Sequence, residues 1–569
     1  DSAVTGDDNT CVGYDTGTEL TSGSYNTFIG KGAGDKTTTG NENIAIGLDA
    51  MGLGITANTS ATQGTYNLAI GSKAGYDLTT GQGNLLIGKS AGEELTTQNY
   101  NVGLGHATLE DATSGPNTAV GALAGQNIST GHSNTFMGYL AGNADCGNYN
   151  TAVGDNAFVK GTGAGNTVVG FDAGSSTRNT TTALSGNNNT LVGNSAGYKL
   201  TTGPGNVLIG KSAGTAMNTG DYNVAIGFEA ADGLVGAATQ NVAIGKHALG
   251  GCTAATNSNI AIGGSALAHA SYAAAAINCA IGKDAGSAIT SGTENVLIGH
   301  EAGSTLAGNG ANTAVGYNSL KFATGANNTA CGAKALSFIV AGADNVAVGA
   351  NALYNAGDAD GTASDGSESF NTAVGSAALY NLESSTADGN TAIGHDAGRF
   401  TPAGGAGTAM TLAINSCYIG KDTNSVAAAG ATNEIVIGYA TVGLGTNTVA
   451  LGNTSIGAIK GEVDFAAYSD KRIKRDITND DTGLAFVEKL QPVTYKPVNP
   501  ADYPEAIADP RFTEFTKQEI VTAAVEAAEA IYEDAIVQDA RAAVAEETRE
   551  EVHAAIEEVT EDVVTPAAE

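Results

Sequence analysis

The sequence predicts a mainly β protein, in which a long repetitive parallel β-solenoid is followed by a smaller C-terminal domain with a coiled-coil helix. Three observations lead to this prediction. Glycine accounts for 80 of the 569 residues, about twice the usual share. A short motif recurs from residue 9 to about residue 455. Charged residues become much more frequent near Ser469, and 79 of the 80 glycines precede that residue. Two unlike regions therefore meet there.

The repeated motif has the form N-x-x-[IV]-G-x-x-A, as in NTFIGKGA (26–33), NVAIGFEA (223–230) and NTAVGSAA (371–378). It occurs 22 times between Gly13 and Gly394, always with Asn four residues before the Gly, and degenerate copies continue to about residue 455. Most copies are 16 to 19 residues apart, which is too short for a pair of helices. A repeat of this size predicts stacked rungs.

Each copy is expected to form one short strand. The residue three before the Gly and the residue just before it are apolar or β-branched, so they face one side with period two. Gly then supplies a turn, and the Ala beyond it permits close approach of another backbone. Stacking would place the Asn side chains one above another, where their amides hydrogen-bond along the rod. At ~4.8 Å per rung, about 25 rungs predict a rod of roughly 120 Å.

The rungs resemble the head repeats of trimeric autotransporter adhesins (YadA-like head repeats). Through the T-T-G-x-x-N linkers at 79–84 and 201–206, they resemble repeats of phage tail fibres more closely. The resemblance covers most of residues 9–455 and implies a left-handed parallel β-roll associated as a homotrimer. We also expect a trimer because a rung of about seventeen residues gives each chain little core of its own.

Past the repeats, residues 468–497 read YSDKRIKRDITNDDTGLAFVEKLQPVTYKP. Taken by itself, this segment is a short basic helix capped by Ser469 or Asp470. It resembles the intramolecular chaperone domain of peptidase family S74, found at the ends of phage tailspikes and fibres. The resemblance implies that Ser469 is the nucleophile and Lys474 its partner in a dyad, with autocleavage between Tyr468 and Ser469.

The residue types suit a single-turnover cleavage. A Ser hydroxyl is a weak nucleophile until a base removes its proton. The like charges of Lys471, Arg472 and Arg475 favour the neutral form of Lys474 that such a base requires, although Asp470 opposes them. Tethering the nucleophile to its own target supplies much of the remaining advantage. No turnover enzyme is expected.

Residues 514–564 are rich in Ala, Glu and Val, with apolar residues at 4-3-4-3 spacing, which predicts an acidic amphipathic helix in a coiled coil. The expected domains are a solenoid shaft at 1–455, a connector at 456–468 and a chaperone domain of α/β and coiled-coil character at 469–569. In the last, the basic motif occupies 469–500 and the helix 514–564.

Several local motifs are interpreted as parts of the repeat. GNLLIGKS (83–90) and GNVLIGKS (205–212) match a P-loop expression, but their central residues are expected to be strand rather than a phosphate-binding loop. His106, His300 and His395 share the slot after the repeat Gly with no acid or Cys at metal-ligand spacing, so we expect solvated turn residues. We expect no metal and no cofactor.

One acidic stretch and six scattered cysteines also contain residue types that can bind metals. The acids of the insertion after residue 350 fail the EF-hand spacing and predict an ordinary acidic loop; they are Asp358, Asp360, Asp365 and Glu368. The cysteines contain no C-x-x-C pair, so neither a zinc site nor a dense disulfide framework is indicated.

Together these features predict a trimeric fibre or adhesin shaft of a virion, folded by a self-cleaving chaperone domain. Its expected partners are a host-surface glycan or protein receptor and a virion attachment protein upstream. The insertions that break the repeat are the expected recognition loops; they are 48–66, 171–188, 350–370 and 395–415. A formal net charge of -33 disfavours nucleic acid and anionic membranes as partners, and no run is long enough to insert into a membrane.

Two alternatives stay open. One is an extracellular or cell-surface bacterial adhesin with an uncleaved trimerisation cap. The other is a polysaccharide depolymerase, which the absence of Trp and of a paired-carboxylate constellation disfavours.

Overall fold

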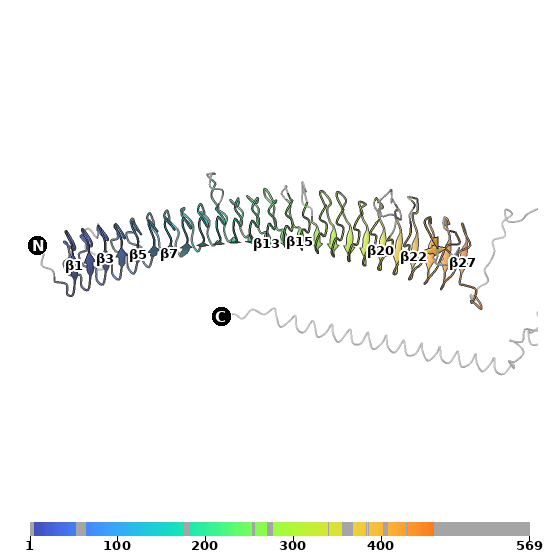
Figure 1. Ribbon diagram of the computed structural model, residues 1–569, viewed down its shortest axis with the longest axis horizontal. Helices are drawn as coiled ribbons and strands as arrows, with labels where there is room; N and C mark the ends of the chain where they lie inside the picture. The colour runs from blue at the N-terminus through green and yellow to red at the C-terminus, as the bar shows by residue number, and fades with distance from the viewer. Residues whose placement is uncertain are drawn as a thin grey trace, which may run out of the picture. The chain divides into compact units, whose positions relative to one another are not determined.

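The computed structural model shows a long, gently curved rod built from stacked turns of one chain (Figure 1). The structure describes residues 5–459, except 53–63, 176–181, 253–255, 270–276, 339–340, 355–367, 383, 385, 402–407 and 428–430. These residues contain strands and turns but no helix, which confirms the predicted β-solenoid. The predicted connector beyond residue 459 and the predicted chaperone domain at 469–569 lie outside the described residues.

Nearly every strand is three or four residues long and ends just before a repeat Gly. The strands are β1 (Thr10–Val12), β2 (Thr27–Ile29), β3 (Ile44–Ile46), β4 (Leu68–Ile70), β5 (Leu85–Ile87), β6 (Val102–Leu104), β7 (Asn117–Val120), β8 (Asn134–Met137), β9 (Thr151–Val153), β10 (Thr167–Val169), β11 (Thr190–Val192), β12 (Val207–Ile209), β13 (Val224–Ile226), β14 (Val242–Ile244), β15 (Ile260–Ile262), β16 (Cys279–Ile281), β17 (Val296–Ile298), β18 (Thr313–Val315), β19 (Thr329–Cys331), β20 (Val346–Val348), β21 (Thr372–Val374), β22 (Thr391–Ile393), β23 (Phe400–Thr401), β24 (Thr408–Ala409), β25 (Cys417–Ile419), β26 (Ile435–Ile437) and β27 (Val449–Leu451).

One parallel sheet runs the length of the rod. It contains 25 strands, each paired in register with the next, so that Thr27 of β2 pairs with Thr10 of β1 and with Ile44 of β3. The exception is β23 and β24, a short antiparallel pair that leaves the sheet between β22 and β25. At ~4.8 Å per strand the sheet is roughly 115 Å long, close to the predicted length.

The core lies inside the turns of a single chain. The middle residue of each strand points inward, as Phe28 of β2, Ala69 of β4 and Leu208 of β12 do, and these side chains are fully buried. The Ala three residues after the repeat Gly is buried as well, for example Ala213. The expectation that a rung gives each chain little core of its own is therefore wrong, because the turn of the rung folds back over the inner face of its strand.

A ladder of Asn side chains joins the rungs along this core, as predicted. The backbone N–H of each ladder Asn donates to the side-chain oxygen of the ladder Asn one rung earlier; Asn223 reaches Asn206 Oδ1 at 2.9 Å. Its side-chain amide donates to the same oxygen and to a backbone oxygen of the following rung, here Ala238 O at 2.7 Å. From Asn26 to Asn390 the ladder Asn residues are at most 2% exposed. Every polar atom of this buried column is thus satisfied.

The repeat Gly is required by the stacking of the rungs. Gly263 has φ +130°, and a Cβ built on it would lie 2.5 Å from the carbonyl oxygen of Gly282 in the next rung. A Cβ built on the adjacent Gly264 would have its nearest neighbouring atom at 3.9 Å, so this position tolerates a side chain. The two P-loop matches follow the same pattern, because their central residues form β5 and β12 as expected and leave no phosphate-binding loop.

Each rung also turns through residues in the left-handed backbone region that the sequence did not reveal. One precedes the ladder Asn, such as Tyr222 with φ 56°, and one lies two residues after the repeat Gly, such as Ser212 with φ 60°. A left-handed residue other than Gly costs roughly 1–2 kcal/mol. The ladder and the core must offset this cost in every rung.

The ladder predicts a strong local effect of Asn223→Ala. This substitution removes the acceptor of the Asn241 N–H, at 3.0 Å, and leaves Ala238 O and Asn206 Oδ1 short of a donor inside the rod. We expect the free energy of unfolding of the neighbouring rungs to fall by about 2–5 kcal/mol, measured by hydrogen exchange and urea denaturation. Asn309→Ala is the matched control, since Asn309 is exposed, and a similar loss there would contradict the role of the ladder.

Candidate functional sites

The outer face of the strands carries a continuous apolar strip. In every strand of the 25-stranded sheet the last residue is Val, Ile, Leu, Met or Cys, and its side chain points away from the core. Exposed fractions of 37% for Ile298, 39% for Val348 and 43% for Ile393 show that water reaches this strip. Soluble monomers rarely expose apolar patches above a few hundred Å². This strip follows the sheet along its described length, from β1 to β27.

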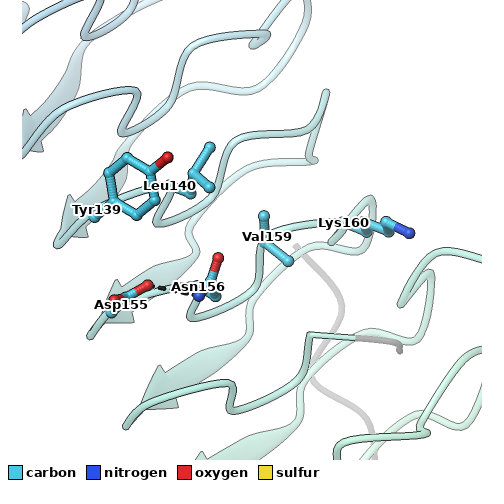
Figure 2. Close-up of a pocket in the computed structure, with 6 residues that line it drawn as sticks. All are labelled: Tyr139, Leu140, Asp155, Asn156, Val159 and Lys160. Carbon is cyan, nitrogen blue, oxygen red and sulfur yellow. Dashed lines mark hydrogen bonds between the residues drawn. The ribbon is translucent and has the colours of Figure 1, made fainter. Parts of the chain in front are cut away.

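The surface of the rod has shallow hollows. One lies on the strand face between β2 and β3, where Tyr25, Thr27, Glu42 and Ile44 line it. Another lies on the turns, where Tyr139 and Leu140 of one rung face Asp155, Asn156, Val159 and Lys160 of the next (Figure 2). Asn156 donates to Asp155 in this hollow, at 2.5 Å. No group of catalytic residues converges in either hollow.

An aromatic column lies on the turns between β18 and β22. Its rings come from successive rungs, with centroid separations of 5.0 to 5.1 Å; they belong to Phe322, Phe338, Tyr354 and Tyr380. The Arg399 guanidinium lies 4.5 Å from the centroids of both Tyr380 and Phe400, and the ammonium groups of Lys321 and Lys334 lie over the rings of Phe322 and Tyr354. This half-buried aromatic column borders two of the insertions, 350–370 and 395–415.

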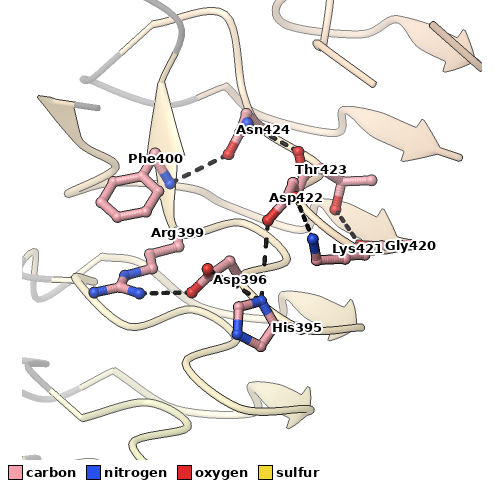
Figure 3. Close-up of polar contacts among 9 residues, drawn as sticks. All are labelled: His395, Asp396, Arg399, Phe400, Gly420, Lys421, Asp422, Thr423 and Asn424. Atoms are coloured by element: carbon pink, nitrogen blue, oxygen red, sulfur yellow. Dashed lines mark hydrogen bonds and ion pairs between the residues drawn. The ribbon is translucent and has the colours of Figure 1, made fainter. Parts of the chain in front are cut away.

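A polar cluster surrounds His395 at the edge of the strand face (Figure 3). His395 Nδ1 lies 3.1 Å from Asp396 Oδ2 and 4.0 Å from Asp422 Oδ1 of the next rung. The remaining oxygens of the two carboxylates bind cations: Asp396 Oδ1 pairs with Arg399 at 2.6 Å, and Asp422 Oδ2 pairs with Lys421 at 3.1 Å. Two rungs thus contribute a His and two carboxylates to one point.

A second cluster of the same composition lies further toward the N-terminus. It joins His300 and Glu301 of one rung to Asp284 of the rung before, with one potential ligand atom from each within 4.8 Å of the others. His300 Nδ1 has no solvent exposure and no hydrogen-bond partner. The expectation that His300 and His395 have no partner acid is therefore wrong. In each cluster one acid directly follows the His in the sequence, and the other comes from a neighbouring rung, where sequence spacing does not show it; of the three, His106 has neither.

Glu368 also departs from its expected place in an acidic loop. Its side chain is fully buried, neither carboxylate oxygen has a hydrogen-bond partner, and burial raises the pKa of Glu368 to about 7. Its backbone oxygen accepts from the Asn345 side chain of the ladder, a role that Gly plays in many rungs. Asp358, Asp360 and Asp365 lie outside the described residues.

The ladder ends in different chemistry near the C-terminal end of the rod. Ser416 replaces Asn after Asn390, and the N–H of Glu434 donates to Ser416 Oγ at 3.1 Å. The buried Glu434 carboxylate accepts from the Tyr418 hydroxyl at 3.2 Å and from the Gly445 N–H at 2.8 Å. A carboxylate that accepts from the rung before it and from the rung after it closes the Asn column.

The cysteines divide between the core and the strand face. Cys146 and Cys252 are buried, and burial raises the pKa of each thiol to about 12. Cys331 is the last residue of β19 and lies exposed in the apolar strip. All six cysteines are free.

The predicted cleavage residues Tyr468, Ser469 and Lys474 lie outside the described residues, so their roles stay predictions. No protein family, curated protein or solved structure matches the chain. Among the described residues, no helix has the length and apolarity to cross a membrane.

The buried Glu368 predicts a pH-dependent weakness in the rod. Because its pKa is raised from 4.5 to about 7, the folded chain keeps this proton between those values while the unfolded chain loses it. The free energy of unfolding of the surrounding rungs should therefore fall by about 3 kcal/mol as pH rises through this range. Urea denaturation from pH 4.5 to pH 8 measures this fall.

Glu368→Gln should reduce that pH dependence, because a neutral amide replaces the acid. Glu294→Gln, at an exposed position, is the control and should leave the pH profile of the parent unchanged. Identical profiles for the parent and Glu368→Gln would contradict a buried protonated carboxyl.

Proposed function

We propose that the chain is the shaft of a homotrimeric fibre that attaches a virion to a host surface, folded by a C-terminal domain that cleaves itself off. The single observation that carries this proposal is the apolar strip along the outer face of all 25 strands. A rod with its own closed core needs no partner in order to fold. It needs partners to cover that strip, and copies of the same chain offer a strip of the same length and period.

The shape of the solenoid supports an attachment role. A rod of stacked rungs projects whatever its turns carry far from its ends. The proposed attachment surface is the aromatic column, whose Tyr354, Arg399 and Phe400 belong to the insertions 350–370 and 395–415. Tyr and Arg are the residue types that dominate binding energies at interfaces, and cations over aromatic rings are common in recognition. A host-surface glycan or protein is the proposed receptor.

The repeats also give a physical reason for the proposed chaperone domain. Rungs of nearly identical chemistry let two chains pair one rung out of step while losing only their end contacts. Parallel pairing of distant segments is slow and exposed to aggregation. A unique trimerising segment at 469–569 would fix the register, and its removal by Ser469 and Lys474 would leave the rod held kinetically.

Sedimentation tests the association. The purified chain is expected to sediment as a trimer at micromolar concentration, and Ile226→Asp with Ile244→Asp should weaken the trimer because both side chains lie in the strip. The control is Asn218→Asp with Ala237→Asp, at exposed turn positions outside the strands, which adds the same charge. A parent that sediments as a monomer, or equal weakening by both pairs, would refute the proposed use of the strip.

The cleavage prediction is independent of that result. Expressed without added protease, the chain should split into a fragment that ends at Tyr468 and one that begins with Ser469. Ser469→Ala removes the attacking oxygen and Lys474→Ala the proton acceptor, so each variant should remain at full length and still form trimers. N-terminal sequencing and mass spectrometry decide. A small fragment with any other first residue rejects the assignment, and an uncut parent trimer indicates a permanent cap.

A further inference from the structure

The clusters around His300 and His395 share one construction. In each, a His directly follows the repeat Gly and an acid directly follows the His, while the neighbouring rung places a second acid two residues after its own Gly. The acids occupy the left-handed position of the turn, with φ 53° at Asp396 and φ 57° at Asp422. This backbone places both carboxylates on the same edge of the rod, one rung apart.

The ion pairs of each cluster leave oxygens free for a further cation. In the His300 cluster, Asp284 Oδ2 pairs with Lys283 at 3.0 Å and Glu301 Oε2 pairs with Lys321 at 2.5 Å. Neither of the other two oxygens has an ion pair among the described residues. In the His395 cluster the oxygens not used by Arg399 and Lys421 are the ones that face His395 Nδ1 (Figure 3).

The imidazole nitrogen is the second sign of a missing ligand. His300 Nδ1 has no solvent exposure, accepts no hydrogen bond and donates none, although its ring is held in place by stacking on Tyr317 with centroids 5.5 Å apart. A buried nitrogen without a partner is costly. A metal ion bound by this nitrogen would remove that cost.

The described part of the rod contains natural comparisons. His106 occupies the same slot after its Gly, but Ala107 follows it, and Ser90 and Leu123 stand where the neighbouring rungs would supply acids. His247 lies 3.2 Å from Glu229 Oε2 and so forms a pair with a single acid. Only the clusters around His300 and His395 bring three potential ligands together among the described residues.

We propose that each of these two clusters binds one divalent first-row transition metal ion, such as Zn²⁺, through one His and two carboxylates from adjacent rungs. Imidazole with carboxylate oxygens suits Zn²⁺ and Co²⁺, whereas Ca²⁺ and Mg²⁺ prefer sites of oxygen alone. Each ion would link two successive rungs, at the turn that follows the strand face. The ion is a clamp between rungs, and water completes its coordination.

Equilibrium dialysis of the full-length chain against Co²⁺ tests the proposal. We expect two saturable ions per chain, with visible d–d absorption, displacement by Zn²⁺ and no displacement by excess Mg²⁺. His300→Ala and His395→Ala should each lose one ion, and the double variant should lose both. His106→Ala is the matched control and should retain two.

Each outcome is decisive for one cluster or for both. Loss of one ion in only one of the two single variants supports that cluster and overturns the other. Unchanged binding in the double variant overturns the proposal. Near-ultraviolet charge-transfer bands typical of Co²⁺ bound to thiolate would assign the ions to cysteines and overturn it too. Because the clusters lie outside the strip, failure here leaves the proposed trimer unaffected.

Discussion

The fold depends on the hydrogen bond that passes from each ladder Asn to the next. An Asn side chain offers one acceptor and two donors, and in this rod all of them are used within three adjacent rungs, as at Asn206, Asn223 and Ala238. A buried amide that missed its neighbour would leave several polar groups without partners, at a cost of about 1–3 kcal/mol each. The ladder therefore keeps every strand in step. It does so equally for rungs 16 residues apart, such as those of Asn117 and Asn101, and 26 residues apart, such as those of Asn371 and Asn345.

That constraint explains what the sequence could predict. Strand, Gly turn and Asn column recur with one chemistry, so the strands, the amide ladder and the parallel sheet could all be predicted from a single unit. Which face of each strand is the inner one could not be predicted, because alternation shows only that two residues share a side. The middle residues, whether small like Ala69 or large like Phe28, fill the core, and the residues on either side of them face outward. Ser469 and Lys474 remain predictions, since nothing in the rod bears on them.

The candidate sites were harder to predict for a related reason. Asp422 and His395 are far apart in the sequence, but one turn of the solenoid brings Asp422 Oδ1 to 4.0 Å from His395 Nδ1. The same stacking brings Tyr354 and Tyr380 into contact across an insertion. In a solenoid, residues far apart in the sequence lie close together when they occupy equivalent positions of adjacent rungs. A residue pattern must therefore be compared at equivalent positions of successive repeats. Glu368 shows the limit of that comparison. Its position in the rung predicts a small residue and its charge predicts exposure to solvent, but the structure buries its side chain.

A uniform ladder also restricts where the rod can recognise anything. The strip, the Asn column and the Gly column repeat from rung to rung. They present the same surface in every rung, so they do not distinguish one position on the rod from another. Among the described residues, distinct chemistry occurs where a position departs from its consensus, as at the aromatic column, at the two His clusters, and at Ser416 and Glu434, where the amide ladder ends. These departures gather between Asp284 and Glu434, in the C-terminal part of the described rod. The proposed association and the proposed recognition would thus use different positions of the same rung, so that changes at the turns would alter binding while the ladder and the strip stay unchanged.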